Sequence, residues 1–421
     1  MASEGPERRV GGSAPAVAML ANAGNTGQLA RPRTGVAFWR TALALDIAGA
    51  TGLMLAWQGV LWLFALLVAY AGRVGTAPET SGEFFTRILV KAEGARHLAI
   101  AQYGYDSLSA AHPPFFAMLT RLLATVGIPL TWAGTIVAHL ALVGALVYLV
   151  ALARLDLAEG AASRTLGVAL LWPAAPLLGM VAPSSLLLLT ATAALYHARR
   201  RQWGWAGVWA AHAALTGGIG LLVLIPLLVE WLEDRPWRLP AREFLGGLGA
   251  VLSAPLAFVA FLALLQVHIG TPRAYFSAQT EVAPGALLRP LGLQTLLDLR
   301  AILANAAPLV RGYPTAEVPF PSSLIPAMID SGVIAIAVLC GIWLLREGRR
   351  SYGLYVLAGA AATFLIGGLP GSAANLLPFA PIYLVLARWF ARPVFGYLGL
   401  ILGIDLLALF VYLAVNGYWP I

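Results

Sequence analysis

Cysteine, lysine and charged residues in general are scarce in this chain. Of its 421 residues one is a cysteine and 11% are Asp, Glu, Lys or Arg, whereas 60% are hydrophobic. The lone Cys340 excludes an intramolecular disulfide and a metal site built from several cysteines. So few charges exclude a soluble globule of this size, because polar residues are too few to cover its surface. The composition therefore predicts an integral membrane protein.

Long apolar runs fill most of the chain. A membrane-spanning helix needs about 20 mostly apolar residues, and about eleven segments qualify. We therefore expect an all-α polytopic membrane fold, with a disordered tail rich in Gly, Ala, Ser and Pro over residues 1–40 and a transmembrane domain over 41–421. The expected spans are 43–70, 132–153, 165–180, 184–198, 203–219, 220–232, 244–266, 324–345, 352–368, 375–390 and 394–415.

The net charge of +8 follows the gaps between the apolar segments, which argues against a nucleic-acid partner. Eleven spans place all the arginine-rich gaps on one side, and the positive-inside rule identifies that side as the cytoplasm. The N-terminus is then cytoplasmic and the C-terminus outside. The single lysine among 27 basic residues, with abundant Ala and Gly, indicates a GC-rich bacterial genome and hence a bacterial plasma membrane. The arginine-rich gaps are 8–40, 154–164, 199–201, 235–242, 346–350 and 388–392.

Two gaps, about 71–131 and about 267–323, are much longer than a connection requires, and both fall on the outer side. We expect them to form the functional site. The first contains "KAEGARHLAIAQYGYDSLSAAHPPFF", in which the only lysine, an acid, an arginine and a histidine lie within seven residues. Residues 83–104 are predicted to form one helix along the membrane surface that ends at Gly104. Helical spacing places one apolar set on or near one face of this helix and Arg87, Lys91 and Gly94 on another side. The apolar set is Phe84, Ile88, Ala92, Ala95 and Ala99. Pro113 and Pro114 are predicted to restart a second apolar segment.

This loop resembles the GT-C membrane glycosyltransferases, in particular the second mannosyltransferase of glycosylphosphatidylinositol anchor assembly and its bacterial relatives. That family shows Arg-Trp-Asp, then Tyr-Leu-x-Ile-Ala-x-x-Gly-Tyr, then Phe-Phe-Pro. The likeness covers about residues 84–230. The matching positions here are Lys91-Ala92-Glu93, then His97, Ile100-Ala101 and Gly104-Tyr105, then His112-Pro113-Pro114, the last being similar to the protein O-mannosyltransferase-like group.

The resemblance implies transfer of a sugar, expected to be mannose, from a polyprenyl phosphate to a hydroxyl of a glycan, lipid or protein acceptor on the outer face, with inversion. An acceptor hydroxyl becomes nucleophilic when a carboxylate takes its proton. Glu93 stands at the family's Asp position and is the expected base. Asp106 is the reserve base or a metal ligand. No cofactor is required, although a divalent metal is compatible with this chemistry.

The remaining candidate residues are expected to bind the substrate. The leaving phosphate needs a cationic partner, for which Arg96 and Arg311 in the second long loop are available. His97 and His112 are expected to orient the base or to contact the phosphate, and Tyr105 stands at the family's Gly-Tyr. No Gly-rich nucleotide-binding motif is present on the cytoplasmic side, which argues against a soluble nucleotide sugar as donor.

Departures from the family pattern keep two alternatives open. Pro183-Ser184 stands in place of Tyr-Ser-Glu, Gly217-Gly218 in place of Arg-Pro, and Asn375 in place of a late arginine. These losses favour a noncatalytic relative that binds a polyprenyl lipid or a partner subunit. The other alternative is a transporter or flippase of lipid-linked sugars, which needs a proton path inside the membrane. Asp405 is expected to lie deep enough for that, whereas Asp46 and Asp330 are expected near water at span ends.

Overall fold

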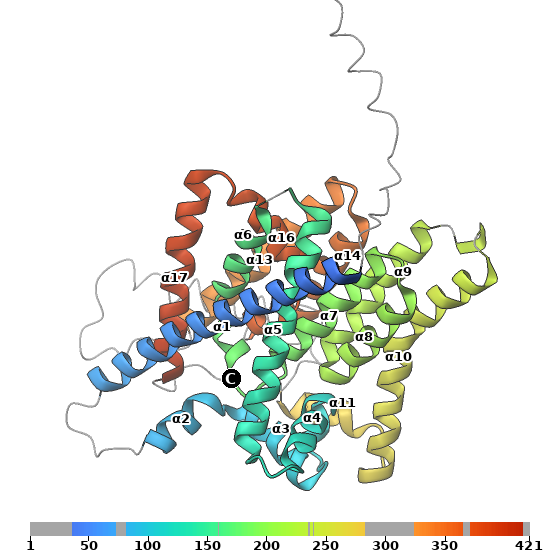
Figure 1. Cartoon of the computed structure of the whole chain (residues 1–421). Helices are drawn as coiled ribbons and strands as arrows, with labels where there is room; N and C mark the ends of the chain where they lie inside the picture. Colours follow the sequence, from blue (N-terminus) through green and yellow to red (C-terminus); the bar gives the residue numbers. More distant parts are fainter. Residues whose placement is uncertain are drawn as a thin grey trace, which may run out of the picture. The chain divides into compact units, whose positions relative to one another are not determined.

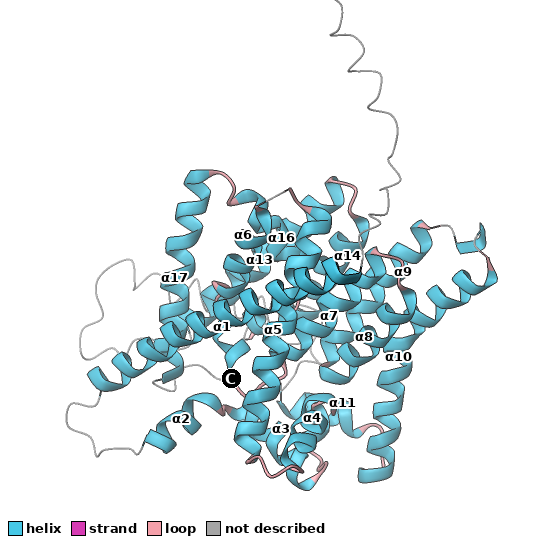
Figure 2. Ribbon diagram, viewed as in Figure 1, coloured by secondary structure: helices cyan, strands magenta, loops and turns pink. Residues whose placement is uncertain are grey.

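The computed structural model describes residues 36–72, 81–158, 160–234, 236–238, 240–282, 324–364 and 371–415. Within these ranges the secondary structure is entirely helical, without a strand (Figure 2). Residues 1–45 and 46–421 form separate units, and all contacts below belong to the second. Residues 1–35 of the expected tail lie outside the described residues.

The described chain forms α-helices joined by short 3-10 helices, labelled η. Their bounds in chain order are α1 Val36–Gly72, α2 Ser81–Leu89, α3 Ala92–Tyr103, η1 Ser109–Ala111, α4 Phe115–Ala124, α5 Leu130–Asp156, α6 Ala161–Leu170, η2 Ala175–Gly179, α7 Ser184–Arg199, α8 Trp203–Thr216, η3 Gly218–Val223, α9 Leu224–Glu233, η4 Pro236–Arg238, α10 Ala241–Ile269, α11 Ala274–Val282, α13 Leu324–Arg346, α14 Arg350–Ala362, α15 Ser372–Asn375, α16 Ala380–Trp389 and α17 Pro393–Val415 (Figure 1).

Five of the described helices are long and apolar enough to cross a membrane, which fits the membrane protein that the composition predicts. Six helices between them are shorter, at 10 to 16 residues. At 1.5 Å per residue they cover about 15–24 Å, less than the roughly 30 Å of a bilayer core. Length and composition therefore do not establish the expected eleven spans. The five long spans are Asp46–Ala71, Leu130–Asp156, Ala241–Ile269, Met328–Arg346 and Pro393–Val415.

The shorter helices form three pairs, α6 with α7, α8 with α9 and α14 with α16, each of which leaves and returns to one end of the bundle. A buried polar network joins their termini there. The Asp156 carboxylate, at the end of α5, accepts hydrogen bonds from Arg199 at the end of α7 and from Arg349 just before α14. Arg199 also pairs with Glu230 of α9 at 3.3 Å, and Arg388 of α16 donates to the Asp156 carbonyl at 3.0 Å. We call this the arginine end.

The opposite end of the bundle carries the first long loop, with α2, α3 and α4, together with α11, and we call it the loop end. Helix α17 leaves the arginine end just after α16, and its last carbonyls accept hydrogen bonds from Arg87 and Lys91, both at 2.8 Å. Gln279 of α11 donates to the carbonyl of Ala111 at 3.1 Å. In Figure 1 these four helices lie together at the lower edge of the view.

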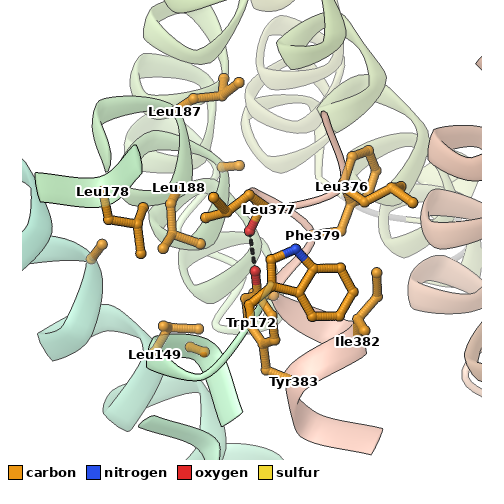
Figure 3. Packing of buried hydrophobic residues seen from close by; sticks show 14 of the residues in the cluster. Leu149, Trp172, Leu178, Leu187, Leu188, Leu376, Leu377, Phe379, Ile382 and Tyr383 are labelled. Carbon is orange, nitrogen blue, oxygen red and sulfur yellow. Dashed lines mark hydrogen bonds between the residues drawn. The ribbon is translucent and has the colours of Figure 1, made fainter. Parts of the chain in front are cut away.

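The largest apolar core of the described residues packs side chains from the first half of the chain against side chains from the last part. Trp172 and Tyr383 pack edge to face with ring centroids 5.6 Å apart. The indole N–H of Trp172 donates to the carbonyl of Ala373 at 2.8 Å, and the Tyr383 hydroxyl donates to that of Leu377 (Figure 3). The polar tips of these two rings therefore have backbone partners, as burial requires.

The expectation for the intramembrane acids is wrong for Asp330. Expected near water, Asp330 is fully buried, and its carboxylate accepts the backbone N–H groups of Gly371 and Ala373 at 2.8 and 2.7 Å. Asp405 lies near the middle of the candidate span Pro393–Val415, with its side chain exposed on the outside of the described helices. Asp46 pairs with Arg154 at 2.6 Å near the arginine end, as a water-accessible position allows. Hydropathy alone did not reveal that backbone donors solvate Asp330.

Candidate functional site

The segment predicted as one surface helix is two helices, α2 and α3, separated at Val90 and Lys91. The break has a backbone cause, because the carbonyl of Leu89 accepts the N–H of Val181, which lies in the turn before α7, at 2.9 Å. Phe84 and Ile88 are buried. In α3 the alanines at 92, 95 and 99 are exposed, and the residues that face the protein interior are Gly94, His97, Ile100 and Ala101.

Gly94 explains why α3 turns this face inward. A Cβ added at this position would lie 2.2 Å from the carbonyl oxygen of Val181, closer than any side chain tolerates. Only glycine lets α3 approach the turn before α7 this closely. His97 lies one helical turn after Glu93 on the same side of α3, because residues four apart are neighbours on a helix. The close approach thus buries His97 and brings Glu93 with it toward the interior.

His112 reaches the same place from the far side of the loop. Gly104, with φ of 88°, ends α3 as predicted, and the chain returns through η1. The N–H of His112 donates to the Ser109 carbonyl at 3.0 Å, and its own carbonyl accepts the Tyr105 hydroxyl at 2.8 Å. Pro113 and Pro114 then lead into α4, as predicted. Contacts with Ser109 and Tyr105 therefore fix the His112 backbone within the loop that follows α3.

Glu93, His97 and His112 form one cluster. One ligand-type atom from each, a carboxylate oxygen or an imidazole nitrogen, lies within 4.8 Å of the other two. The two imidazoles meet edge to face with centroids 5.1 Å apart, and His97 packs in the same manner on Phe116 at 5.4 Å. The cluster thus joins three of the residues that the sequence singled out. Glu93 and His97 come from α3, and His112, 15 residues after His97, comes from the end of η1.

Two nitrogens of this cluster are buried without a partner. Nδ1 of His97 and Nε2 of His112 have no hydrogen bond within the described residues. Leaving a buried polar atom unpaired costs about 1–3 kcal/mol, and native structures contain few such atoms. Two of them side by side, next to a carboxylate, therefore mark this cluster as a site for a ligand or ion.

Burial sets the protonation state of the cluster. It raises the pKa of Glu93, an effect that the positive charge of Arg96 opposes. Burial, followed by the neighbouring His112, lowers the pKa of His97 to about 3. Burial, followed by the charge of Arg96, lowers the pKa of His112 to about 4. Near neutral pH both imidazoles are therefore uncharged, and each has a lone pair available on one nitrogen.

Arg96 is the cation of the site. It is half-buried on α3, one residue before His97, and its charge acts on both Glu93 and His112. A guanidinium there is placed to bind an anionic oxygen that enters the cluster. Arg311, the other cation that the sequence proposed for the phosphate, lies outside the described residues.

Asp106 and Tyr105 have structural partners. The Asp106 carboxylate accepts the N–H of Ser109 at 2.7 Å, and the Asp106 N–H donates to Oγ of Ser109 at 2.8 Å. These bonds to Ser109 lower the pKa of Asp106, which is exposed at the start of η1. Burial raises the pKa of the Tyr105 phenol, which binds the His112 backbone. In the structure Asp106 shapes the turn and Tyr105 holds His112, and neither belongs to the three-residue cluster.

The sequence singled out each member of the cluster separately and suggested a metal-ligand role for none of them, only for Asp106, which lies outside the cluster. The available signal was Glu93 and His97 at helical spacing, followed by a second histidine before two prolines. That the chain folds back on itself through η1 is a tertiary contact that spacing did not reveal. The roles of Arg87 and Lys91 at the end of α17 were missed for the same reason.

Comparison of the sequence with protein-family models gives no match, and a search among curated proteins gives none. The likeness to GT-C transferases therefore stays a prediction from residue order in the first loop. The described fold, helical with long apolar spans, is compatible with that prediction and with other polytopic membrane proteins.

Proposed function

We propose that this chain is a GT-C-like membrane glycosyltransferase that moves a sugar, mannose in the first place, from a polyprenyl phosphate to an acceptor hydroxyl. The observation that supports this most strongly is the site at the loop end. A carboxylate, a guanidinium and two neutral imidazoles gather there, next to the apolar helices that a lipid-linked donor needs. We also propose eleven membrane passes, made of the five long spans and the six helices of the three short pairs. The loop end is then on the outer side of a bacterial plasma membrane.

Each group of the site has a part in this reaction. The anomeric carbon forms a bond to the acceptor oxygen while its bond to the phosphate oxygen breaks. The Glu93 carboxylate takes the acceptor proton, and its raised pKa makes it a stronger base than an exposed carboxylate. The departing phosphate is already an anion, so it needs a cation and no acid, and Arg96, whose charge acts on Glu93 and His112, provides one.

The transferase test uses purified full-length protein in lipid nanodiscs with radiolabelled polyprenyl-phosphate mannose and a panel of acceptors. Glu93→Gln retains size but is no base near neutral pH, so transfer should fall by about 10²–10⁴-fold with donor binding little changed. Glu243→Gln is the matched control, because Glu243 is an exposed acid at the start of α10 and should leave the rate unchanged. If the parent moves no sugar from any polyprenyl donor to any acceptor, the proposal is wrong.

One observation favours the noncatalytic alternative. At Gly218, where the family has a larger residue, a Cβ would lie 2.3 Å from the Tyr275 hydroxyl of α11. The space beside this position is therefore filled in this chain. A lipid-binding relative without transfer would bind polyprenyl-phosphate mannose in the same nanodiscs but turn none over, and Glu93→Gln would then bind as the parent does. The transporter alternative still rests on Asp405 within the candidate span Pro393–Val415. Asp330 adds nothing to it, because backbone N–H groups already satisfy its carboxylate.

A further inference from the structure

The cluster at the loop end has the composition of a metal site. Glu93 and His97 lie one helical turn apart on α3, and His112 faces them from the end of η1, with one ligand-type atom of each within 4.8 Å of the others. Two histidines and one carboxylate are a ligand set that catalytic zinc sites use, with a further position left open for water or substrate. Imidazole also suits Cu²⁺, Fe²⁺ and Ni²⁺, but hard cations such as Mg²⁺ prefer oxygen ligands.

The unpaired nitrogens supply the second, independent observation. His97 is 1% exposed, and its Nδ1 has no partner among the described residues, as is also true of Nε2 of His112. Phe116 packs against one side of His97, with ring centroids 5.4 Å apart. A buried lone pair on each ring, beside a carboxylate, is what a metal ion satisfies and what a purely structural histidine pair leaves unsatisfied.

We infer that Glu93, His97 and His112 bind a divalent transition-metal ion, of which Zn²⁺ is the best match. Around a tetrahedral zinc ion with bonds of about 2.0–2.2 Å, ligand atoms lie about 3.4 Å apart. The ligands therefore need to close by roughly an ångström, which rotations of the Glu93 side chain and the His112 ring supply. The backbone contacts of His112 with Ser109 and Tyr105 stay in place during this movement.

Arg96 identifies what the open position binds. A guanidinium beside a divalent ion is repelled by it, so the two are stable together when an anionic oxygen lies between them. The phosphate of a polyprenyl-phosphate donor is such an anion, and this step alone rests on the proposed function. In that case Glu93 would act as a ligand, and the ion would supply positive charge to the departing phosphate, while the acceptor proton would pass to solvent. Metal binding by the three residues stands whether or not any sugar is moved.

Metal content and Co²⁺ absorption of the full-length protein in detergent test the site without reference to activity. The parent is expected to retain one Zn²⁺ per chain after dialysis, and Co²⁺ is expected to give the intense visible bands of a four-coordinate site. Substitution of the residues that hydrogen-bond to metal ligands usually lowers metal affinity by about 10–100-fold. Glu93→Gln, His97→Gln and His112→Gln replace the ligands themselves, so each should weaken binding by at least as much. His268→Gln is the control, because His268 is exposed on the last turn of α10 at the same end.

The outcomes separate the two proposals. No stoichiometric Zn²⁺ and no Co²⁺ bands in the parent overturn the metal site even if a ligand variant fails to fold. Undiminished Zn²⁺ in His97→Gln and His112→Gln overturns it as well. Arg96→Gln should bind Zn²⁺ at least as tightly as the parent, and loss of the ion there contradicts the inference. Zinc bound without any sugar transfer overturns the transferase and supports the metal site. Transfer at an undiminished rate by protein made metal-free with a chelator supports the transferase and overturns the ion's part in the reaction.

Discussion

At the residue scale, the position of Gly94 decides the geometry of the site. A Cβ added at Gly94 would lie 2.2 Å from the carbonyl oxygen of Val181, so any other residue at this position would clash with that carbonyl. The neighbouring atom is backbone and belongs to the turn before α7, so it cannot rotate away as a flexible side chain does. The close approach is therefore a property of one residue, and it places Glu93 and His97 toward the interior.

Gly94→Ala is expected to destabilise the fold by about 1–3 kcal/mol, the usual range for overpacking. Thermal unfolding of the protein in detergent measures this effect. Gly59→Ala is the matched control: Gly59 lies within α1 with no atom within 4 Å of an added Cβ. Because Ala has a higher helix propensity than Gly, that variant should be neutral or slightly more stable. Equal stability of the two variants would show that α3 does not pack against Val181 as described.

At the element scale, α3 shows what the sequence could and could not predict. Gly104 as the helix stop and the restart of a helix after Pro113-Pro114 were predicted correctly, because glycine and proline act locally. The break at Val90–Lys91 and the inward face of α3 were not, because alanines at helical spacing carry a weak hydrophobic signal. Packing against Val181, which lies 87 residues beyond Gly94 in the chain, overrode it.

The end of α17 accounts for the chain's only lysine. The last carbonyls of a helix have no partner within the helix and carry a partial negative charge. Lys91 donates to the carbonyl of Ala414 and Arg87 to that of Val415. Burial, followed by repulsion from Arg87, lowers the pKa of Lys91. In this structure the residue that stands at the family's arginine position stabilises a helix end and ties it to the first loop.

Lys91→Met should therefore loosen the last turn of α17. A cation at a helix C-terminus contributes up to about 2 kcal/mol in a partly buried setting, so a loss of about 1–2 kcal/mol in stability is expected. Amide hydrogen exchange over 393–415 should rise mainly in its last turn. Lys91→Arg should retain most of the effect, and Arg273→Met, at an exposed residue between α10 and α11, should have none. Unchanged exchange in Lys91→Met would show that this contact does not hold α17.

At the scale of the whole molecule, two distinct ends emerge from the polar contacts. Ion pairs bring the arginine-rich gaps near 154, 199–201, 349 and 388 together at the arginine end. The first long loop and the end of α17 meet at the loop end. The sequence predicted this grouping from charge alone, although the number of spans is not established. Charge alone could predict the grouping because each short pair begins and ends at the same end of the bundle. Whether a pair is counted as two membrane passes or as none, the arginine-rich gaps before and after it stay on the same side of the membrane.

Cysteine labelling tests this arrangement and its orientation in one experiment. In a Cys340→Ala background, which removes the only native thiol, Gln102→Cys is exposed on α3 at the loop end, and Gly204→Cys is exposed at the start of α8 at the arginine end. An added Cβ at Gly204 meets no atom within 4 Å, so the change is mild. By the positive-inside rule, an impermeant maleimide applied to intact cells should label Gln102→Cys and leave Gly204→Cys unlabelled until the cells are opened.

The opposite pattern would reverse the orientation and place the Glu93 cluster in the cytoplasm, where a polyprenyl-phosphate donor would have to face inward. Labelling of both positions from outside would contradict the two-ended bundle itself, since the polar network around Asp156 and the contacts of Lys91 with α17 require these positions to lie at opposite ends.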